Sequence, residues 1–105
     1  MGKPDTRRLD KAIRETTRKL EAVRNREMWP LDGRERRTVI AAAASGTYRI
    51  TRGRSTSSAE QRIDATWSAA ETRLTAEITA LQIERQRIVT ENAKAKAAKK
   101  SSGWW

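Results

Sequence analysis

The sequence contains no cysteine, no histidine and no phenylalanine, and only 2 prolines. Without cysteine the chain forms no disulfide scaffold and offers no thiolate for a zinc site or for nucleophilic catalysis. Without histidine it lacks the side chain that most often serves as a general base or as a transition-metal ligand. The remaining serines, threonines and carboxylates form no recognisable catalytic constellation. We therefore expect no enzymatic activity, no metal, no cofactor and no small-molecule substrate.

Aliphatic side chains are also scarce, with 5 leucines, 7 isoleucines and 3 valines among 105 residues. This share lies below the roughly 20% under which a highly charged chain has difficulty burying enough apolar surface to fold. The longest apolar run, residues 39–44, is far shorter than the ~18 residues of a membrane span. The start of the chain lacks an apolar signal core, so we expect a cytoplasmic protein without a membrane span.

Charge of one sign dominates, because 23 lysines and arginines outnumber 13 acidic residues and leave a net charge of +10. Residues 1–58 hold 15 basic and 7 acidic side chains, residues 59–92 hold 4 and 6, and residues 93–105 hold 4 and 0. Two cationic ends therefore flank a slightly acidic middle. Concentrated positive charge most often binds polyanions.

The first predicted helix begins near Asp5, just after Pro4, and runs to about Met28. Side chains at positions 9, 13, 16, 20, 23 and 27 recur along it at steps of three and four, which gives one narrow and partly polar seam. Trp29 followed by Pro30 ends this helix, because the residue before a proline avoids the helical conformation.

A second predicted helix starts at Asp32, whose side chain caps the free amides while Glu35, three residues later, reaches back to the cap. Gly46 is expected to end this helix, since glycine readily adopts the left-handed conformation found just beyond helix ends. Residues 46–57 are then predicted to be a basic loop, because Gly53 and a run of serine and threonine disfavour regular structure.

The third predicted helix starts at Ser57, which forms a second capping box with Glu60, and extends to about Ala98. Large apolar residues recur along it every seven positions, but only one of the residues four positions after each is apolar, so the pattern is a poor autonomous coiled coil. A fuller apolar stripe surrounds these residues and is wide enough to pack against another helix. The residues predicted to form an oligomer or partner interface are Trp67, Leu74, Ile78, Leu81, Ile88, Trp104 and Trp105.

These patterns together predict an all-α protein of three helices. The long C-terminal helix pairs antiparallel with the first helix, and a short middle helix crosses one end. Residues 1–92 form a single helical domain that contains the basic loop 46–57, and residues 93–105 form a lysine-rich tail ending in Trp-Trp. Because one chain offers little core, we expect a homo-oligomer.

The cationic segments suggest the function. The predicted loop is rich in arginine and has no acidic residue between Gly46 and Ser58. Arginine donates two parallel hydrogen bonds to phosphate, lysine adds salt-sensitive contacts, and a tyrosine can stack on a base. The leading hypothesis is a small accessory protein, of the kind found in phages or mobile elements, that binds DNA or RNA largely without sequence specificity. The residues predicted to contact nucleic acid are Arg34, Arg36, Arg37, Tyr48, Arg49, Arg52, Arg54, Lys94, Lys96, Lys99 and Lys100.

A structural or assembly role is the alternative hypothesis. In a virion or scaffold subunit, the basic ends would dock on acidic protein surfaces, and Trp104 and Trp105 would anchor into a neighbouring chain. An adaptor that folds on one protein target and a peripheral membrane protein are further interpretations. The arginines could also form an ordinary solvated surface, and the heptad residues could pack within one chain.

Overall fold

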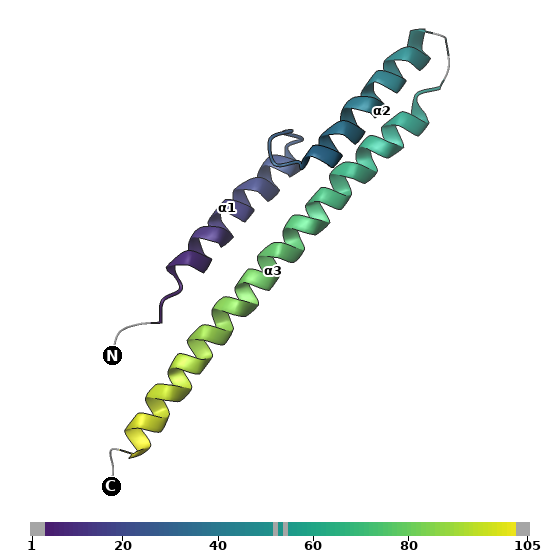
Figure 1. Ribbon diagram of the computed structural model, residues 1–105. Coiled ribbons are helices and arrows are strands. Elements are labelled where there is room, and N and C mark those ends of the chain that lie inside the picture. The colour runs from purple at the N-terminus through teal and green to yellow at the C-terminus, as the bar shows by residue number, and fades with distance from the viewer. Residues whose placement is uncertain (1–3, 52, 54, 103–105) are drawn as a thin grey trace.

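The computed structural model describes residues 4–51, 53 and 55–102. These residues form three helices, α1 (Arg7–Arg24), α2 (Gly33–Thr51) and α3 (Ser57–Ser102), and no strand. Figure 1 shows α1 and α2 following one another along α3, which runs back past both of them. The predicted all-α class and the antiparallel pairing of the first helix with the long C-terminal helix are therefore confirmed.

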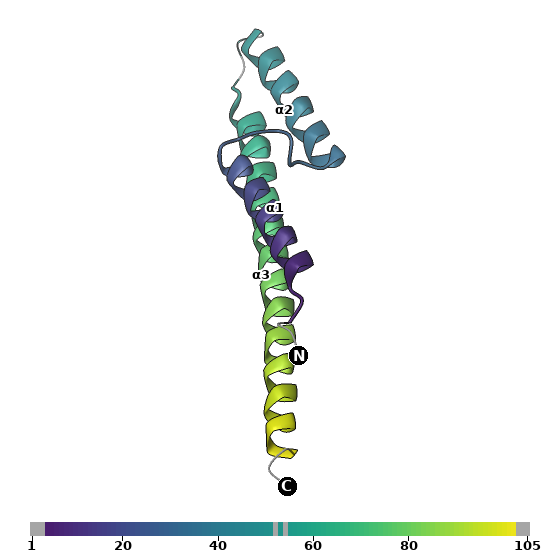
Figure 2. The ribbon, with the colours of Figure 1, turned by 90° about the vertical axis from the view of Figure 1, so that its left-hand side faces the viewer.

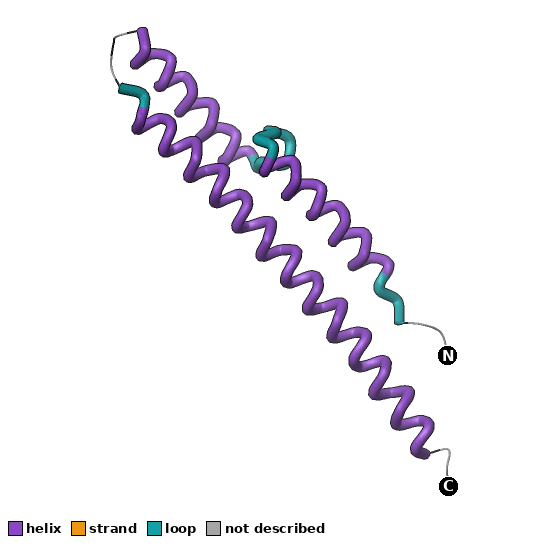
Figure 3. The backbone as a smooth tube through the Cα atoms, turned by 180° about the vertical axis from the view of Figure 1, so that it is seen from behind, coloured by secondary structure: helices purple, strands orange, loops and turns teal. Residues whose placement is uncertain are grey.

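The middle helix lies differently from the prediction. Instead of crossing one end, α2 runs lengthwise along α3, as Figure 3 also shows, and Figure 2 shows that α1 and α2 approach α3 from different sides. With its 19 residues, α2 is about 28 Å long, whereas the molecule has principal extents of 84 × 19 × 18 Å. The inward side of α2, formed by Val39, Ala42 and Gly46, follows the helix axis at steps of three and four, so α2 packs along α3.

The first helix ends earlier than predicted, at Arg24. The amide of Glu27 donates a hydrogen bond to the carbonyl of Ala22 at 2.8 Å, and the amide of Arg26 donates to the carbonyl of Val23 at 2.9 Å. These two bonds form a Schellman motif, which closes a helix through a residue in the left-handed conformation. Arg26 takes that conformation, with φ of 61°. The predicted end near Met28 follows only from the later proline, Pro30, and takes no account of an arginine in the left-handed conformation.

Hydrogen bonds at the starts of the other two helices test the predicted capping boxes. The amide of Glu35 donates to Asp32 Oδ1 at 2.7 Å and the amide of Asp32 donates to Glu35 Oε1 at 3.0 Å, which confirms the first box. The second box differs, because Thr56 rather than Ser57 precedes the first turn. The Thr56 hydroxyl donates to Glu60 Oε1 at 2.9 Å, and the amide of Glu60 donates to the Thr56 carbonyl at 3.0 Å.

Gly46 does not end α2, which continues to Thr51, so residues 46–51 of the predicted loop are helical. A helix interior tolerates glycine at a cost of about 1 kcal/mol relative to alanine. Here Gly46 and Ala42 are buried and face α3, where a Cβ added to Gly46 would lie 3.5 Å from the Cβ of Ala59. The glycine is therefore part of a close helix–helix contact rather than a stop signal.

The core lies where the end of α1, the connection after it and the start of α2 meet the middle of α3. Its buried residues are Leu20, Val23, Leu31, Trp67, Ala70 and Leu74. Half-buried side chains pack around them, namely Met28, Val39, Ile63 and Ile78. Leu74 is 0% exposed and Val23 is 1% exposed, so these two are the largest fully buried side chains among the described residues.

Ion pairs tie α1, the connection and α2 to α3. They join Arg24 to Glu71 at 3.1 Å, Arg26 to Asp64 at 3.7 Å, Arg73 to Glu35 at 2.9 Å and Arg85 to Asp10 at 2.6 Å. The guanidinium of Arg26 also lies 5.5 Å from the ring centroid of Trp67. Partly exposed pairs of this kind contribute at most about 1 kcal/mol each. They show which parts of α3 lie opposite α1, the connection and α2.

Candidate nucleic-acid interface

Among the arginines predicted to contact nucleic acid, the three in the first turns of α2 point in different directions. Successive residues of a helix are about 100° apart, so Arg34 and Arg36 lie roughly 160° apart around the axis, with Arg37 between them. Arg34 lines a shallow groove between α2 and α3, beside Thr66. The Nε of Arg37 donates to the carbonyl of Gly33 at 3.2 Å, one turn back in the same helix. The described arginines of α2 therefore do not converge on one surface.

Arg36 has a partner in the connection between α1 and α2. Its Nε donates to the carbonyl of Met28 at 3.4 Å, and its Nη2 donates to the carbonyl of Trp29 at 2.9 Å. These carbonyls follow the end of α1, where backbone acceptors have no helical partner. Arg36 thus holds the connection in place.

Several predicted contact residues cannot be placed at the level of side chains. Tyr48 and Arg49 lie in α2, but their side chains fall outside the described part of the structure. Four further predicted residues lie outside the described residues altogether, namely Arg52, Arg54, Trp104 and Trp105.

The predicted lysine tail is a direct continuation of α3, which runs without a break to Ser102. The ion pair of Arg85 with Asp10 fixes how far α1 reaches along α3. Since α1 begins at Arg7, the last turns of α3, residues 89–102, extend roughly 20 Å beyond it at 1.5 Å per residue. We refer to these residues as the α3 overhang. Its exposed lysines are Lys94, Lys96, Lys99 and Lys100.

The lysines of the α3 overhang lie mostly on one side. Residues seven apart share a face of a helix, so Lys99 lies on the same face as Arg85, which contacts α1. Lys96 is three residues before Lys99 and falls on this face as well, whereas Lys94 points the opposite way. The face of α3 that α1 covers therefore becomes a lysine surface beyond the start of α1.

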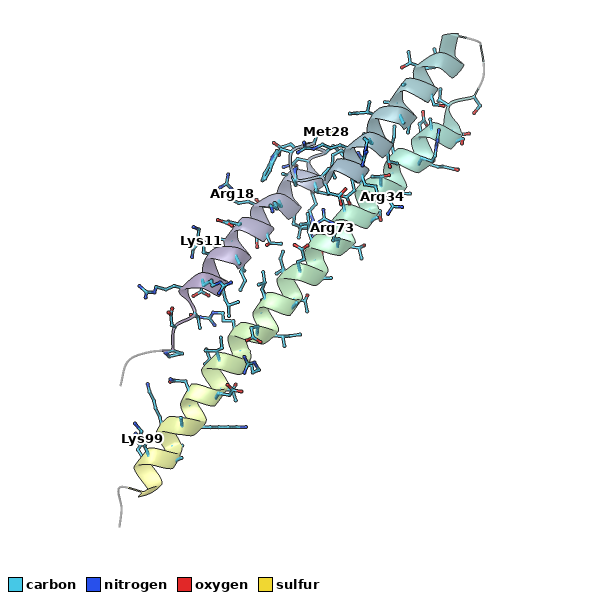
Figure 4. All side chains as sticks on the ribbon, in the orientation of Figure 1. Lys11, Arg18, Met28, Arg34, Arg73 and Lys99 are labelled. Carbon is cyan, nitrogen blue, oxygen red and sulfur yellow. The ribbon has the colours of Figure 1, made fainter. Side chains whose placement is uncertain are left out.

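The outer face of α1 carries a row of basic side chains that the sequence analysis did not single out. Arg7, Lys11, Arg14 and Arg18 follow one another at steps of four, three and four, which places them within roughly 60° of arc. All four are exposed, and we refer to them as the α1 basic stripe. Figure 4 shows Lys11 and Arg18 pointing away from α3.

The α1 basic stripe keeps most of its charge available. Arg7 forms an exposed ion pair with Asp5 at 3.5 Å, whereas Lys11, Arg14 and Arg18 have no ion pair with any described residue. In contrast, three of the four arginines between residues 59 and 92 pair with acids. Most cations of the middle segment are therefore paired with acids, whereas Lys11, Arg14 and Arg18 of the stripe face solvent.

Asp10 lies in the first turn of α1 and is turned toward α3. Hydrogen bonds from Arg85 Nε at 2.6 Å and from the Thr6 hydroxyl at 2.9 Å hold its carboxylate there. These two bonds, the one from Arg85 first, lower the pKa of Asp10 below its ordinary value of 3.8. The carboxylate is thus ionised at neutral pH. Arg85 is its main partner, and attraction to Arg14 of the α1 basic stripe is the smallest of the contributions that lower its pKa.

An exposed aromatic side chain lies beside Arg18, at the C-terminal end of the α1 basic stripe. Trp29, in the connection after α1, is 48% exposed. Together with Glu15, Arg18 and Lys19 it lines an open hollow of about 250 Å³. The sequence predicts Trp29 at the end of the first helix, but it gives no sign that the side chain lies beside the basic residues of that helix. Arginine, lysine and an aromatic ring at one place are the side chains that nucleic-acid surfaces combine.

The residues predicted as an oligomer interface are largely used within the chain. Trp67 is 5% exposed and Leu74 is fully buried in the core, and Ile78 packs against that core. Leu81 and Ile88 are half-buried. The heptad pattern of α3 thus corresponds to packing against α1 and the connection in a single chain.

Comparison of the chain with models of protein families, with curated proteins and with solved structures finds no match. Within the described ranges, no helix combines the length and the apolar character needed to cross a membrane. The same residues contain no group of acidic side chains suited to holding a metal ion. The cationic surfaces are accordingly the features on which a functional proposal rests.

Proposed function

We propose that the protein binds nucleic acid through phosphate contacts, and that the α1 basic stripe is the primary contact surface. The observation that supports this proposal is the row Arg7, Lys11, Arg14 and Arg18 on the outer face of α1, three of which have no ion pair with a described residue. Exposed cations in a regular row attract a polyanion and release its condensed counterions on binding.

The α3 overhang extends this surface. The stripe covers roughly 16 Å of α1 and the overhang adds roughly 20 Å, so the two together span about 35 Å. That length corresponds to about ten phosphates along one strand of a duplex at 3.4 Å each. Lys11, Arg18 and Lys99 point to the same side of the rod in Figure 4. A single nucleic-acid segment can therefore contact both surfaces.

Sequence specificity is not expected from this surface. Its side chains are mostly lysines and arginines on the outside of a straight rod, which suits phosphate oxygens rather than the edges of bases in a groove. The function is thus the one predicted from the sequence, but the main contact lies on α1 instead of on the arginines of α2. The arginines of α2 become secondary, because Arg36 holds the connection and Arg34 lies beside α3.

Two charge-matched triple variants test the location of the contact. In the first, Lys11, Arg14 and Arg18 are replaced by glutamine. In the second, Arg34, Arg37 and Arg62 are replaced by glutamine, which removes the same charge from other exposed positions. Binding of a fluorescent oligonucleotide of about 20 nucleotides to nuclease-treated protein is measured by anisotropy at about 100 mM salt. By the counterion-release relation, loss of three phosphate contacts weakens binding about 100-fold.

We expect this loss in the first variant and a change within about threefold in the second, because an exposed charge outside the contact acts only through screened long-range attraction. An equal loss in both variants would show that net charge alone drives binding. A loss of affinity confined to the second variant would indicate that the contact surface includes the arginines of α2. If the unmodified protein does not bind, the proposed function is wrong.

An assembly role is the second candidate, and the α3 overhang favours it. A helix of this length with no packing partner is marginal in water, so contact with another molecule would stabilise it. Light scattering on nuclease-treated protein distinguishes the two functions. A defined oligomer supports assembly, whereas a particle of 11.9 kDa that binds oligonucleotides supports the first proposal.

A further inference from the structure

We propose that Trp29 is a stacking platform for an unpaired base, so that the protein prefers single-stranded nucleic acid to duplex. This inference rests on the proposed function and adds the class of substrate. The site consists of the Trp29 indole, the cations Arg18 and Lys19 and the carboxylate of Glu15, which together line one open hollow beside the α1 basic stripe.

The exposure of Trp29 contrasts with that of its neighbours. The next two residues, Pro30 and Leu31, are buried, and Leu31 is only 3% exposed. The indole of Trp67, in the core, is 5% exposed, whereas that of Trp29 is 48% exposed. The chain has few large apolar side chains. Burial of this indole would therefore have stabilised the fold, and the exposed ring gives up that stabilisation. A binding role accounts for this exposure.

The backbone under the indole is held rigidly. The amide of Leu31 donates to the carbonyl of Met28 at 3.1 Å, which closes a turn around Trp29. The guanidinium of Arg36 donates to the carbonyls of Met28 and Trp29 on the same turn. A ring presented on a fixed backbone loses little conformational freedom when a ligand binds. The connection thus presents an aromatic surface that is formed before nucleic acid arrives.

The chemistry around the indole suits a nucleotide. Arg18 is the last member of the α1 basic stripe and lies in the hollow with Lys19, so a strand that follows the stripe brings a phosphate to the indole. The Glu15 carboxylate can accept a hydrogen bond from an N–H group of a base, such as the ring N3–H of thymine or uracil, and it repels a phosphate, which favours a base at that side of the hollow. The hollow, at about 250 Å³, is smaller than the ~300 Å³ of ordinary drug-sized pockets and fits one planar group better than an enclosed ligand.

The indole of Trp29 can stack only on a base that is unpaired and unstacked. In a duplex each base is already stacked between its neighbours and paired, so its ring face is not accessible without opening the helix. In a single strand the faces are accessible, and stacking on aromatic side chains is tolerant of sequence. The same basic stripe would therefore bind both forms through phosphates, and Trp29 would add affinity to the single strand alone.

The test compares the unmodified protein with Trp29→Leu and Trp29→Phe. Each is titrated with oligo(dT), oligo(U) and a duplex of equal length at the same salt. Leucine keeps an apolar side chain without a ring, so Trp29→Leu should weaken binding to the single strands about 5- to 150-fold and leave duplex binding within about twofold. Phenylalanine restores a ring and should recover most of the loss. The two single strands distinguish DNA from RNA.

Circular dichroism of each variant checks that the helices are intact. If Trp29→Leu unfolds, Trp29→Phe still decides the matter, because oligo(dT) should quench indole emission of the unmodified protein and quench it markedly less when Trp29 is absent. Equal affinities for single strand and duplex, or an equal loss for both in Trp29→Leu, would overturn the inference while leaving the proposed function intact. Absence of binding to every probe would overturn both.

Discussion

Replacement of Gly46 by alanine tests directly whether the second helix passes through this position. In the structure Gly46 is helical and buried against α3. A Cβ at this position would meet the Cβ of Ala59 at 3.5 Å, which is ordinary van der Waals contact. The added methyl group therefore fits without displacing α3. Alanine also loses less backbone entropy on folding than glycine does, and it is the best helix former.

The expected result is a gain in stability. Glycine to alanine in a compatible helix interior contributes about 0.4–1 kcal/mol. For a chain of this size that corresponds to a rise in Tm of roughly 2–8 °C. Thermal unfolding followed by circular dichroism at 222 nm, with urea titration as a second measure, is sufficient to detect it. If Gly46 instead occupied the left-handed position after a helix end, alanine would cost about 1 kcal/mol, and Tm would fall.

Gly53 supplies the matched control. Its φ is +71°, and a Cβ there would have no atom within 4 Å, so only backbone strain opposes a side chain. Gly53→Ala should therefore lower stability by about 1 kcal/mol. Opposite signs at the two glycines would support the assignment of α2. A loss of stability in Gly46→Ala, comparable to that in Gly53→Ala, would refute it.

Three further predictions concern the core, a helix cap and pH. Leu74→Ala should lower the free energy of unfolding in urea by about 3–5 kcal/mol, because Leu74 is 0% exposed. Ile83→Ala, at a site that is 65% exposed, should change it by no more than about 0.5 kcal/mol. Similar losses in the two variants would contradict the assigned core. Asp32→Ala should cost about 1 kcal/mol, since it removes the cap of α2, and an unchanged Tm would argue against the capping box. Hydrogen bonding to Arg85 lowers the pKa of Asp10 from 3.8. The contribution of this ion pair to the free energy of unfolding is therefore complete above the pKa of the unfolded state, and it is lost as pH falls through the lower pKa of the folded state. Asp10→Asn should therefore lower Tm at pH 7 and flatten the decline of Tm below about pH 4, and an unaltered acid profile would exclude this pair as a source of pH dependence.

Features that depend on neighbouring residues in the sequence could be predicted well. The capping box of Asp32 and Glu35 needs only a spacing of three residues, and the structure contains both of its hydrogen bonds. The long uninterrupted α3 follows from a segment without glycine or proline. Features that depend on contacts between distant segments could not be predicted in the same way. Gly46 is accommodated in a helix because Ala59, on another helix, lies against it.

The candidate site shows the same division. Arg36 belongs to a dense run of arginines in the sequence, but the carbonyls that it binds are brought to it by the connection after α1. The α1 basic stripe was present in the sequence as a regular spacing from Arg7 to Arg18, and a helical projection of the charged residues would have revealed it. Trp29 lies beside Arg18 because the chain turns back after the Schellman motif at the end of α1. This turn could not be predicted, because its left-handed residue is Arg26 rather than a glycine.

The most direct test of the central claim is the dependence of oligonucleotide affinity on salt, measured with nuclease-treated protein between about 50 and 200 mM. If the four cations of the α1 basic stripe and Lys96, Lys99 and Lys100 of the α3 overhang contact the phosphates of a single strand, the slope of log K against log salt should be about −5. Glutamine at Lys11, Arg14 and Arg18 should make it shallower by about 2–3. A slope that this triple variant leaves unchanged, or no binding at the lowest salt, would contradict the account.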